Sequence, residues 1–460
     1  MKTIFLPIFN GLRSRNFFRT DIYRELIRDK NIRLVVLAPA HKIDFYKKEF
    51  NEPNIIFESW NNATEPFWGK VLHSIAFSLL NTGTIREKQR AVYIKDGNLA
   101  KFLVKRSFTV IFGNNKFLRK VIRWLDRFVY LNKEVIFFLN RYKPDLVLVP
   151  DIILESDRVI LRAAKRKRIL TVGMVRSWDN LTAKGVIQVL PDKLISQTTH
   201  MKQDIIKYAD VLGKDIVILG VAQFDDYYRK RNISREDFLN QLGIPSSRKL
   251  VLCAPFFDVY SNKSGILIIK KLVEAVDSGK LPKDIHFLVR YRPESGNASE
   301  FDENDIIGPY VTITKPCQNV FKKESRLDFE FSDEDMDLLT NSLYFSDVTI
   351  NTISTLTVDA AALDKPIINI RFDGDPDCPP WARVKLFSNF DHYKLLEATG
   401  GVRLVYSVEE LINQINVYLN NPRLDGEGRK KIREQQVEFF DGQSGKRIAD
   451  YIKKLLDTGY

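Results

Sequence analysis

Short apolar segments alternate with amphipathic segments along most of the chain, and this alternation limits the folds that it can adopt. In the first half the apolar segments cover residues 2–8, 32–39, 54–60, 145–150, 170–175, 193–198 and 215–220. In the second half they cover residues 249–257, 286–293, 311–316, 348–351, 367–372 and 402–406. Continuous apolar strands between amphipathic helices are typical of a parallel sheet with helices on both faces. We therefore expect an α/β protein with two doubly wound sheets.

The length of the chain indicates how these segments are divided. A chain of 460 residues is too long for one ordinary core, so two domains are expected. The first is expected over residues 1–220, interrupted by a helical insertion at about 66–142. The second is expected over residues 221–430, followed over 431–460 by helices that pack back toward the first domain. The simplest arrangement places the two domains on either side of a central cleft.

Several classes of protein are disfavoured by the composition. No stretch approaches the roughly 20 apolar residues of a membrane-spanning helix, and residues 4–9 fit a first strand better than a signal peptide. The cysteines (Cys253, Cys317 and Cys378) are scattered, which suits a reducing cytoplasm. The five histidines lack metal-ligand spacing, and neither a P-loop nor a G-x-G-x-x-G motif is present. We therefore expect no cofactor and no metal.

The insertion carries the strongest charge bias of the chain. Between residues 101 and 130, eight basic residues stand against one acidic residue and are interleaved with seven aromatic residues. Basic side chains beside aromatic anchors suit a helix on an anionic membrane surface. Two other interpretations stay open, a helix whose apolar side lies in the core and a nucleic-acid patch. No nucleic-acid-binding motif accompanies the charge, which disfavours the latter.

A hydroxyl-rich loop in the second half joins a strand to a helix. Strand 348–351 runs into the polar residues 352–355, and a helix is predicted over 357–363. Such a loop presents backbone N–H groups and the positive end of the helix dipole, which together bind anions. Open α/β sheets also bind ligands at the carboxyl ends of their strands, which is where this loop is expected to lie. We predict that the loop holds the diphosphate of a nucleotide-linked donor, with a capped helix in an ordinary βαβ unit as the alternative.

A carboxylate follows the strand over 170–175. Asp179 stands beside Trp178 and Asn180, with Lys184 nearby, and is expected to accept a proton from an acceptor hydroxyl. The alternative is a turn in which Asp179 and Asn180 cap backbone N–H groups.

Other basic and glycine-rich stretches suit anions. Arg290 and Arg292 end a strand and share one face, which suits bidentate binding of phosphate, although surface ion pairs are the alternative. Arg13, in the polar loop after the first strand, is a further candidate for contact with the acceptor or with phosphate. The glycine-rich turn at 440–447 opens the last helix, so it either holds an anion or caps that helix.

Two of these stretches resemble the CDP-glycerol glycerophosphotransferase (teichoic acid polymerase) family. They are SDVTINTISTLTVDAAALDKPIINIRFD (346–373) and DGQSGKRIADYI (441–452). A third stretch, ILGVAQFDDYY (218–228), is similar to the linker of the wider group to which that family belongs and which includes capsule and lipid-linked glycosyltransferases and UDP-GlcNAc 2-epimerases. The resemblance implies a GT-B fold of two Rossmann-like domains, with the donor in the C-terminal domain and the acceptor toward the N-terminal one.

The resemblance also implies roles for individual residues. Ser354 and Thr355 would face the donor diphosphate, and Asp359 would approach the ribose or the phosphate-binding network. Thr352, in the same polar loop, is a further candidate for donor binding. Arg292 matches a basic position of the family, and three further matches lie in the terminal motif, at Asp441, Ser444 and Arg447. One stretch departs from the pattern. Where the polymerases have Trp-His-Gly-Thr, with the histidine as base, this chain has Ser-Trp-Asp-Asn at 177–180.

These features together predict a metal-independent glycosyltransferase at the inner face of the cytoplasmic membrane. It would move a sugar from a nucleotide-sugar donor to a hydroxyl of a lipid-linked or growing bacterial surface glycan, such as capsule or O-antigen, with Asp179 as base. Three alternatives stay open. They are a CDP-glycerol- or CDP-ribitol-dependent transferase, an enzyme like UDP-GlcNAc 2-epimerase, and a non-catalytic membrane or nucleic-acid binding protein.

Overall fold

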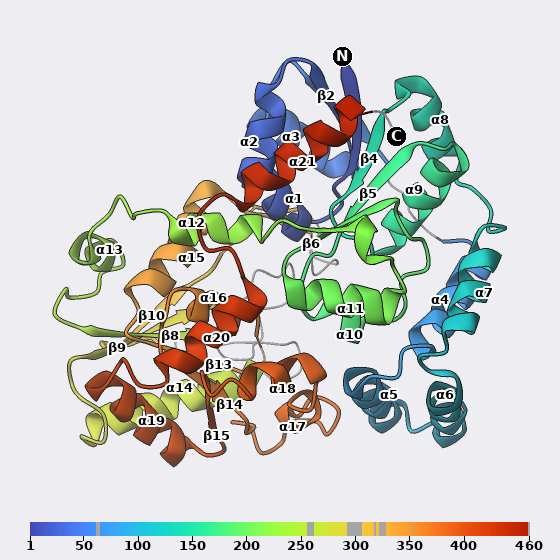
Figure 1. Ribbon diagram of the computed structural model, residues 1–460. Coiled ribbons are helices and arrows are strands. Elements are labelled where there is room, and N and C mark those ends of the chain that lie inside the picture. The colour runs from blue at the N-terminus through green and yellow to red at the C-terminus, as the bar shows by residue number, and fades with distance from the viewer. Residues whose placement is uncertain are drawn as a thin grey trace. The chain divides into compact units, whose positions relative to one another are not determined.

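The computed structural model describes residues 1–60, 65–254, 262–291, 306–316, 319–321, 328–352 and 354–458. The chain forms two compact units, drawn in Figure 1. The first unit comprises Met1–Gln89, Asn98–Asp225 and Asp441–Tyr460, and the second comprises Arg90–Gly97 and Asp226–Phe440. Each unit is built around its own parallel sheet, so the predicted α/β class is confirmed.

The sheet of the first unit has seven strands in the order β3-β2-β1-β4-β5-β6-β7. Its strands are β1 (Lys2–Pro7), β2 (Ile32–Ala38), β3 (Ile55–Ser59), β4 (Leu146–Val149), β5 (Leu170–Met174), β6 (Lys193–Ser196) and β7 (Ile216–Ile218). Every pairing is parallel, and Phe5 of β1 lies opposite both Val35 and Val147. The strand order reverses between β1 and β4, and ligands of open α/β sheets bind outside the carboxyl ends of strands at such a point.

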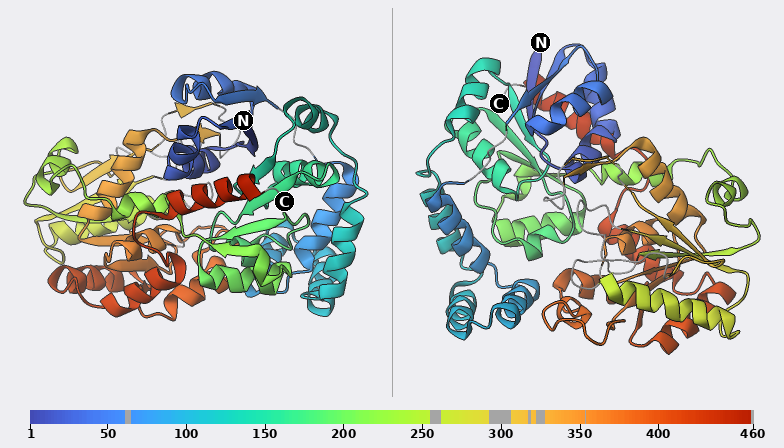
Figure 2. Two further views of the ribbon diagram at one scale, coloured as in Figure 1. Left: turned by 45° about the horizontal axis from the view of Figure 1, so that its top comes forward. Right: turned by 180° about the vertical axis from the view of Figure 1, so that it is seen from behind.

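Helices cover both faces of this sheet because successive strand residues point to opposite sides. Ile4 and Leu6 pack on the face that carries Ile448, whereas Phe5 and Val147 pack on the other face. Both views of Figure 2 place the red C-terminal helix α21 beside the blue helix α2. The helices outside the insertion are α1 (Gly11–Phe18), α2 (Asp21–Arg28), α3 (Ile43–Glu49), α9 (Glu155–Arg166), α10 (Asn180–Ala183), α11 (Thr199–Ala209) and α21 (Ser444–Thr458).

The helical insertion begins and ends close to the predicted residues. It consists of α4 (Phe67–Ser78), α5 (Gly83–Asp96), α6 (Leu99–Phe112), α7 (Lys116–Asp126) and α8 (Lys133–Tyr142). A small core of its own includes Leu72, Leu80 and Ile122. Two of the eight basic residues between 101 and 130 are not surface charges, because Arg119 and Arg123 both pair with Asp210 at 3.1 Å.

The second unit has a six-stranded parallel sheet in the order β10-β9-β8-β13-β14-β15. Its strands are β8 (Lys249–Ala254), β9 (Ile285–Arg290), β10 (Val311–Thr314), β13 (Val348–Asn351), β14 (Ile367–Ile370) and β15 (Arg403–Val405). A separate antiparallel pair joins β11 (Asn319–Val320) to β12 (Phe329–Glu330). In the register of β13, Ile350 lies opposite Cys253 on one side and Ile368 on the other.

The helices around this sheet complete the second unit. They are α13 (Arg235–Gln241), α14 (Asn262–Asp277), α15 (Asp333–Phe345), α16 (Leu356–Ala362), α17 (Val384–Phe387), α18 (Asp391–Glu397), α19 (Val408–Asn420) and α20 (Gly426–Gln436), while α12 (Asp225–Tyr228) follows the first unit directly. Helix α20 packs on α16 and belongs to the second unit, whereas the chain from Asp441 onward belongs to the first. None of the helices in the described residues is long and apolar enough to cross a bilayer.

Candidate functional site

The hydroxyl-rich loop of the second unit lies at the carboxyl end of the buried strand β13. Helix α16 begins at Leu356, one residue earlier than predicted. The amide of Leu356 donates to Ser354 Oγ at 3.2 Å, that of Thr357 to the Ser354 carbonyl at 3.2 Å, and that of Val358 to the Thr355 carbonyl at 2.9 Å. These three amides thus donate within the loop, which corrects the expectation that the start of the helix presents free N–H groups.

Beneath this loop three neutral side chains form a buried network. Asn351 Oδ1 accepts from Thr357 Oγ1 at 3.0 Å and from Asn369 Nδ2 at 2.9 Å, and the same Nδ2 lies 3.2 Å from Thr357 Oγ1. All three side chains are buried, as is Thr352. Because buried polar groups are costly unless they are paired, this network fixes the strand ends to the first turn of α16.

The other predicted donor residues lie on separate elements of the second unit. Asp359, half-buried on α16, accepts from the hydroxyl of Tyr227 at 2.8 Å. Arg290 ends β9 and is only 6% exposed, so it is not the surface arginine of the alternative interpretation. Its Nη2 donates to the carbonyl of Asp335, at the start of α15, at 3.4 Å. Arg292 lies outside the described residues.

In the first unit the predicted base lies at the carboxyl end of β5. Asp179 directly precedes α10 and is half-buried, and its side chain makes no capping hydrogen bond. The expected alternative of a capping Asp179 is therefore not what the structure shows. Trp178 packs against the core, and Lys184 is exposed. Asn180 is 1% exposed, and neither of its amide atoms has a hydrogen-bond partner in the described part of the chain.

A lysine that the sequence did not single out lies close to this loop. Lys88, on α5, donates from Nζ to the carbonyl of Ala183 at 2.7 Å. Burial and, to a smaller extent, the charge of Lys184 lower the pKa of Lys88 to about 8, against the opposing effect of Asp179. Lys88 thus interacts electrostatically with Asp179 and with Lys184 beside α10. The partners of Lys88 lie more than ninety residues away in sequence, so no local signal indicates this contact.

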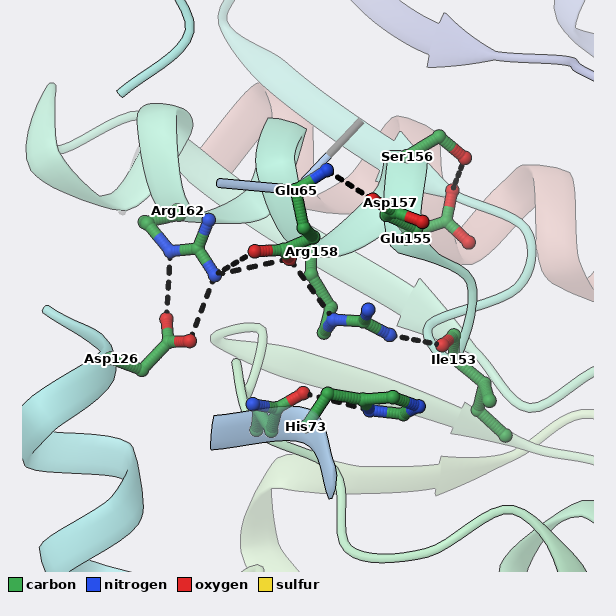
Figure 3. Close-up of polar contacts among 10 residues, drawn as sticks. Glu65, His73, Asp126, Ile153, Glu155, Ser156, Asp157, Arg158 and Arg162 are labelled. Carbon is green, nitrogen blue, oxygen red and sulfur yellow. Dashed lines mark hydrogen bonds and ion pairs between the residues drawn. The ribbon is translucent and has the colours of Figure 1, made fainter. Parts of the chain in front are cut away.

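A network of buried ions joins the insertion to helix α9 (Figure 3). Arg162 binds Asp126 through two hydrogen bonds of 2.8 Å and lies 3.3 Å from Glu65, which also accepts from Arg158 at 3.1 Å. These four side chains are all buried, and they connect α7 and the start of α4 to the helix that follows β4. Removing one partner of such a network leaves an uncompensated buried charge, which is strongly destabilising.

The same network approaches the segment after α10. His73 Nδ1 lies 3.1 Å from Gln188 Oε1, and Arg158 donates to the carbonyl of Ile153 at 2.8 Å. Burial and the nearby charge of Arg158 lower the pKa of His73, which favours its neutral form. Loops at the carboxyl ends of β4 and β5 are thereby tied to the insertion.

Arg13 is placed inside the first unit. It is fully buried and pairs with Asp157, while its Nη1 donates to Ser156 Oγ at 3.4 Å. Burial raises the pKa of Asp157 and the guanidinium of Arg13 opposes that rise. The protein's own carboxylate thus binds the guanidinium that was expected to meet an acceptor or a phosphate.

The terminal motif is likewise engaged by the protein itself. Asp225 accepts from the amides of Ser444 and Gly445 at 3.0 and 2.7 Å, so a carboxylate from the linker motif caps α21. Arg447 binds Asp441 through two hydrogen bonds of 2.8 and 3.0 Å and Ser444 Oγ at 3.1 Å. The helix-cap alternative thus describes the observed contacts of the terminal motif.

Predicted site residues of the described part of the chain lie in both units. Trp178, Asp179, Asn180 and Lys184 lie in and around α10 of the first unit, whereas Thr352, Ser354, Thr355 and Asp359 lie at and after the end of β13 in the second. Among the described residues no three His, Cys, Asp or Glu side chains converge as a metal ion requires, and metal independence stays a prediction.

Comparison with known structures identifies the fold. Staphylococcus aureus MnaA with UDP is 13% identical with a TM-score of 0.57, and the match covers 99% of this chain and 97% of that one. UDP-GlcNAc 2-epimerase from Neisseria meningitidis bound to UDP-GlcNAc is 12% identical with a TM-score of 0.54, covering 99% and 100%. The wall teichoic acid polymerase TagF soaked with CDPG is 12% identical with a TM-score of 0.51, covering 99% and 89%. These likenesses confirm the predicted GT-B fold.

Comparison of the sequence identifies the family. None of the curated proteins compared with the chain matches it. The model of the family described as CDP-Glycerol:Poly(glycerophosphate) glycerophosphotransferase matches residues 186–454, which is more than half of the chain. This stretch contains the hydroxyl-rich loop, the linker and the terminal motif. The chain therefore belongs to the CDP-glycerol:poly(glycerophosphate) glycerophosphotransferase family, and it is a transferase with a GT-B fold.

Proposed function

We propose that the protein transfers a sugar from a nucleotide-linked donor to a hydroxyl of a lipid-linked or growing bacterial surface glycan. The observation that carries the proposal is the state of Asp179, a carboxylate at the carboxyl end of β5 that makes no capping hydrogen bond. Membership of a transferase family supplies the reaction class. Asp179 lies before the stretch that the family model matches, and only the resemblance described above sets it where the polymerases have histidine.

Asp179 is proposed as the base that accepts the proton of the acceptor hydroxyl. A base must be ionised and held within hydrogen-bond reach of that proton. The cation Lys88 lies near enough to Asp179 for the two to interact, and this attraction raises the pKa of Lys88 against the effect of its burial. Asn180 and Trp178 follow and precede it on the same short loop, where they are proposed to contact the acceptor.

The loop 352–355 is proposed to bind the donor diphosphate. The hydroxyls of Thr352, Ser354 and Thr355 are hydrogen-bond donors, and the network beneath the loop holds the strand ends and the helix in place. Preorganised donors stabilise charge that develops on a leaving group without reorganising during the reaction. Asp359 and the cation Arg290 are proposed to complete the donor site. No metal enters this proposal.

The family match favours a second candidate, transfer of a polyol phosphate from CDP-glycerol or CDP-ribitol. That donor differs from a nucleotide sugar in the group that is transferred, while the diphosphate is common to both. A screen of donors therefore separates the two candidates. The departure from the family pattern at 177–180 favours the sugar.

We further propose that the insertion contacts the inner face of the cytoplasmic membrane. Phe117 is 72% exposed and Trp124 is 54% exposed on α7, and Val104 and Ile111 are exposed on α6. Five of the basic residues around them are exposed as well, namely Lys101, Lys105, Lys116, Lys120 and Arg127. Apolar side chains amid basic residues suit an interface that is apolar in its interior and anionic at its surface.

Binding of nucleotides provides the first test. Purified protein is heated with UDP, CDP, GDP or CMP and their sugar and glycerol conjugates, with and without EDTA. A ligand at 100 times its dissociation constant stabilises by about 2.7 kcal/mol, so the matching nucleoside diphosphate should raise Tm with or without EDTA. The absence of a shift with every nucleotide would contradict the proposal, and a shift lost with EDTA would contradict metal independence.

Turnover with the donor so identified then tests the base. We expect Asp179→Asn to lower kcat by about 10² to 10⁴ while nucleotide binding is kept. Asp457→Asn, on the exposed end of α21, serves as the matched control and should leave kcat unchanged. Full turnover by Asp179→Asn would refute the role of Asp179.

For the membrane contact, Phe117→Ser with Trp124→Ser should abolish sedimentation with phosphatidylglycerol vesicles, and Tyr406→Ser should not.

A further inference from the structure

A small pocket opens at the carboxyl edge of the first unit's sheet and contains none of the site residues considered above. It is lined by residues that follow β4, β5, β6 and β7, among them Pro150, Arg176, Gln197 and Gln223. Its volume is about 30 Å³. One water needs roughly 10–15 Å³ on this scale, so the pocket suits a group of a few heavy atoms rather than a whole sugar ring.

Arg176 is the polar side chain whose hydrogen bonds are incomplete at this pocket. Its Nε lies 3.4 Å from Asp151 Oδ2, and its carbonyl accepts from Gln197 Nε2 at 2.9 Å. Its Nη1 is buried and has no hydrogen-bond partner in the described part of the chain. A buried donor without an acceptor is costly, so a ligand that brings an acceptor oxygen to Nη1 gains more than an ordinary hydrogen bond.

The charges around Arg176 disfavour an anion as that ligand. Asp151 binds Arg176, and its neighbour Asp157 binds Arg13, so two buried carboxylates already match two guanidinium groups. Two further cations nearby are engaged as well, since Arg15 donates to the amide oxygens of Asn16 and Gln223 and Arg447 pairs with Asp441. A neutral carbonyl or hydroxyl oxygen is therefore a better partner for Nη1 than a phosphate, which would add an uncompensated charge.

The apolar part of the lining narrows the choice further. Ile22, Ile195 and Ile448 contribute apolar surface beside the polar groups. We propose that the pocket binds the acetamido group of a 2-acetamido sugar, with its carbonyl oxygen accepting from Arg176 and its methyl group against the isoleucines. This inference rests on the proposed function, because it takes the 2-acetamido sugar to be part of the acceptor glycan.

Saturation-transfer NMR on the full-length protein tests the proposal without donor or turnover. The probes are N-acetylglucosamine, glucose and inorganic phosphate, and the protein carries either the native residue, Arg176→Gln or Arg168→Gln. Arg168 is an exposed arginine on the turn before the same strand, and it makes the matched control. We expect saturation of the acetyl methyl protons, and affinity for N-acetylglucosamine about ten- to hundredfold above that for glucose.

Arg176→Gln should remove this preference and Arg168→Gln should keep it. Ala222→Leu, which fills the pocket from its lining, gives a second loss-of-binding variant should Arg176→Gln fail to fold, as circular dichroism would reveal. Three results would overturn the proposal: binding of glucose as tight as that of N-acetylglucosamine, undiminished binding by Arg176→Gln and Ala222→Leu, or competition by phosphate. Because no nucleotide is present, a failed donor screen would refute the proposed function and leave this result to stand by itself.

Discussion

The two units use different kinds of interaction to hold the segments that follow their strands. In the first unit buried ions predominate, such as Arg13 with Asp157 and Arg162 with Asp126. In the second unit the loop after β13 rests on the amides of Asn351 and Asn369 and a threonine hydroxyl. Charged groups thus hold the helix after β4 in the first unit, whereas neutral polar groups hold the loop after β13 in the second unit.

This difference matches the chemistry proposed for each unit. A donor diphosphate is itself negatively charged. The neutral hydroxyl groups of the loop after β13 can donate to it directly, whereas a cation paired with a carboxylate of the protein would first have to break that pair. Proton transfer from an acceptor requires an ionised base, and Asp179 lies in the unit where charged groups are already balanced against one another. The comparison also predicts that the two units respond differently to substitution and to pH.

The largest effect is expected from Arg162→Met in the first unit. The change leaves Asp126 and Glu65 buried without their shared cation, and breaking a buried ion pair from one side costs about 3–5 kcal/mol. Urea unfolding should therefore show a midpoint well below that of the native protein. Restoring apolar packing with Asp126→Leu in the same chain should recover part of the loss.

Arg166→Met, one turn further along α9, controls for the loss of an arginine from that helix. Arg166 is exposed, and its guanidinium contacts a backbone carbonyl rather than a carboxylate. We expect a change within about 0.5 kcal/mol, as for most surface substitutions. If Arg162→Met and Arg166→Met were equally mild, the first unit would not depend on its ions and the comparison would fail.

A smaller loss is expected from Asn369→Ala in the second unit. The substitution removes one of the two donors to Asn351 Oδ1, and an impaired buried hydrogen bond costs about 1–3 kcal/mol. Because the network is neutral, the loss should be the same at pH 5 and pH 8 in urea titrations. The control is Asn416→Ala, whose exposed amide donates to the Lys280 carbonyl and should matter little. A loss that changes with pH would show that the second unit is coupled to charge after all.

The sequence predicted the sheets better than it predicted the side-chain partners. Apolar runs and their spacing are local signals, so β13 is found at Val348–Asn351 as expected and the insertion begins at Phe67. Arg13 was expected to contact a ligand, but it pairs with Asp157 instead. The two residues are 144 positions apart in the sequence, so no local pattern indicates their contact. The same holds for α21, whose start was expected to hold an anion or a cap and is capped by Asp225.

Lys88 and Arg176 were missed for the complementary reason. Each is an ordinary basic residue in its own segment, and its importance comes from burial beside groups on other elements. Conversely, Asp179 could be proposed from the sequence because a carboxylate that follows a predicted parallel strand is a local pattern, and ligands bind at the carboxyl ends of such strands. Its role as a base stays a prediction until the Asp179→Asn variant is measured.

The smallest effect is expected from Lys88→Met, read as a change in how stability depends on pH. The folded protein lowers the pKa of Lys88 to about 8, whereas an unfolded lysine has a pKa near 10.4. Between these values the unfolded chain binds more protons, so this residue makes stability rise with pH from about 8 to about 10. The slope has an upper limit of about 1.4 kcal/mol per pH unit, and partial exposure of Lys88 reduces it. Urea midpoints at pH 7, 8, 9 and 10 should therefore diverge between the native protein and Lys88→Met, whereas Lys120→Met, at an exposed site on α7, should follow the native protein. If the urea midpoints of all three proteins changed with pH in parallel, Lys88 would not be desolvated. The charged groups that stabilise the first unit would then be its buried arginines and their carboxylates, without Lys88.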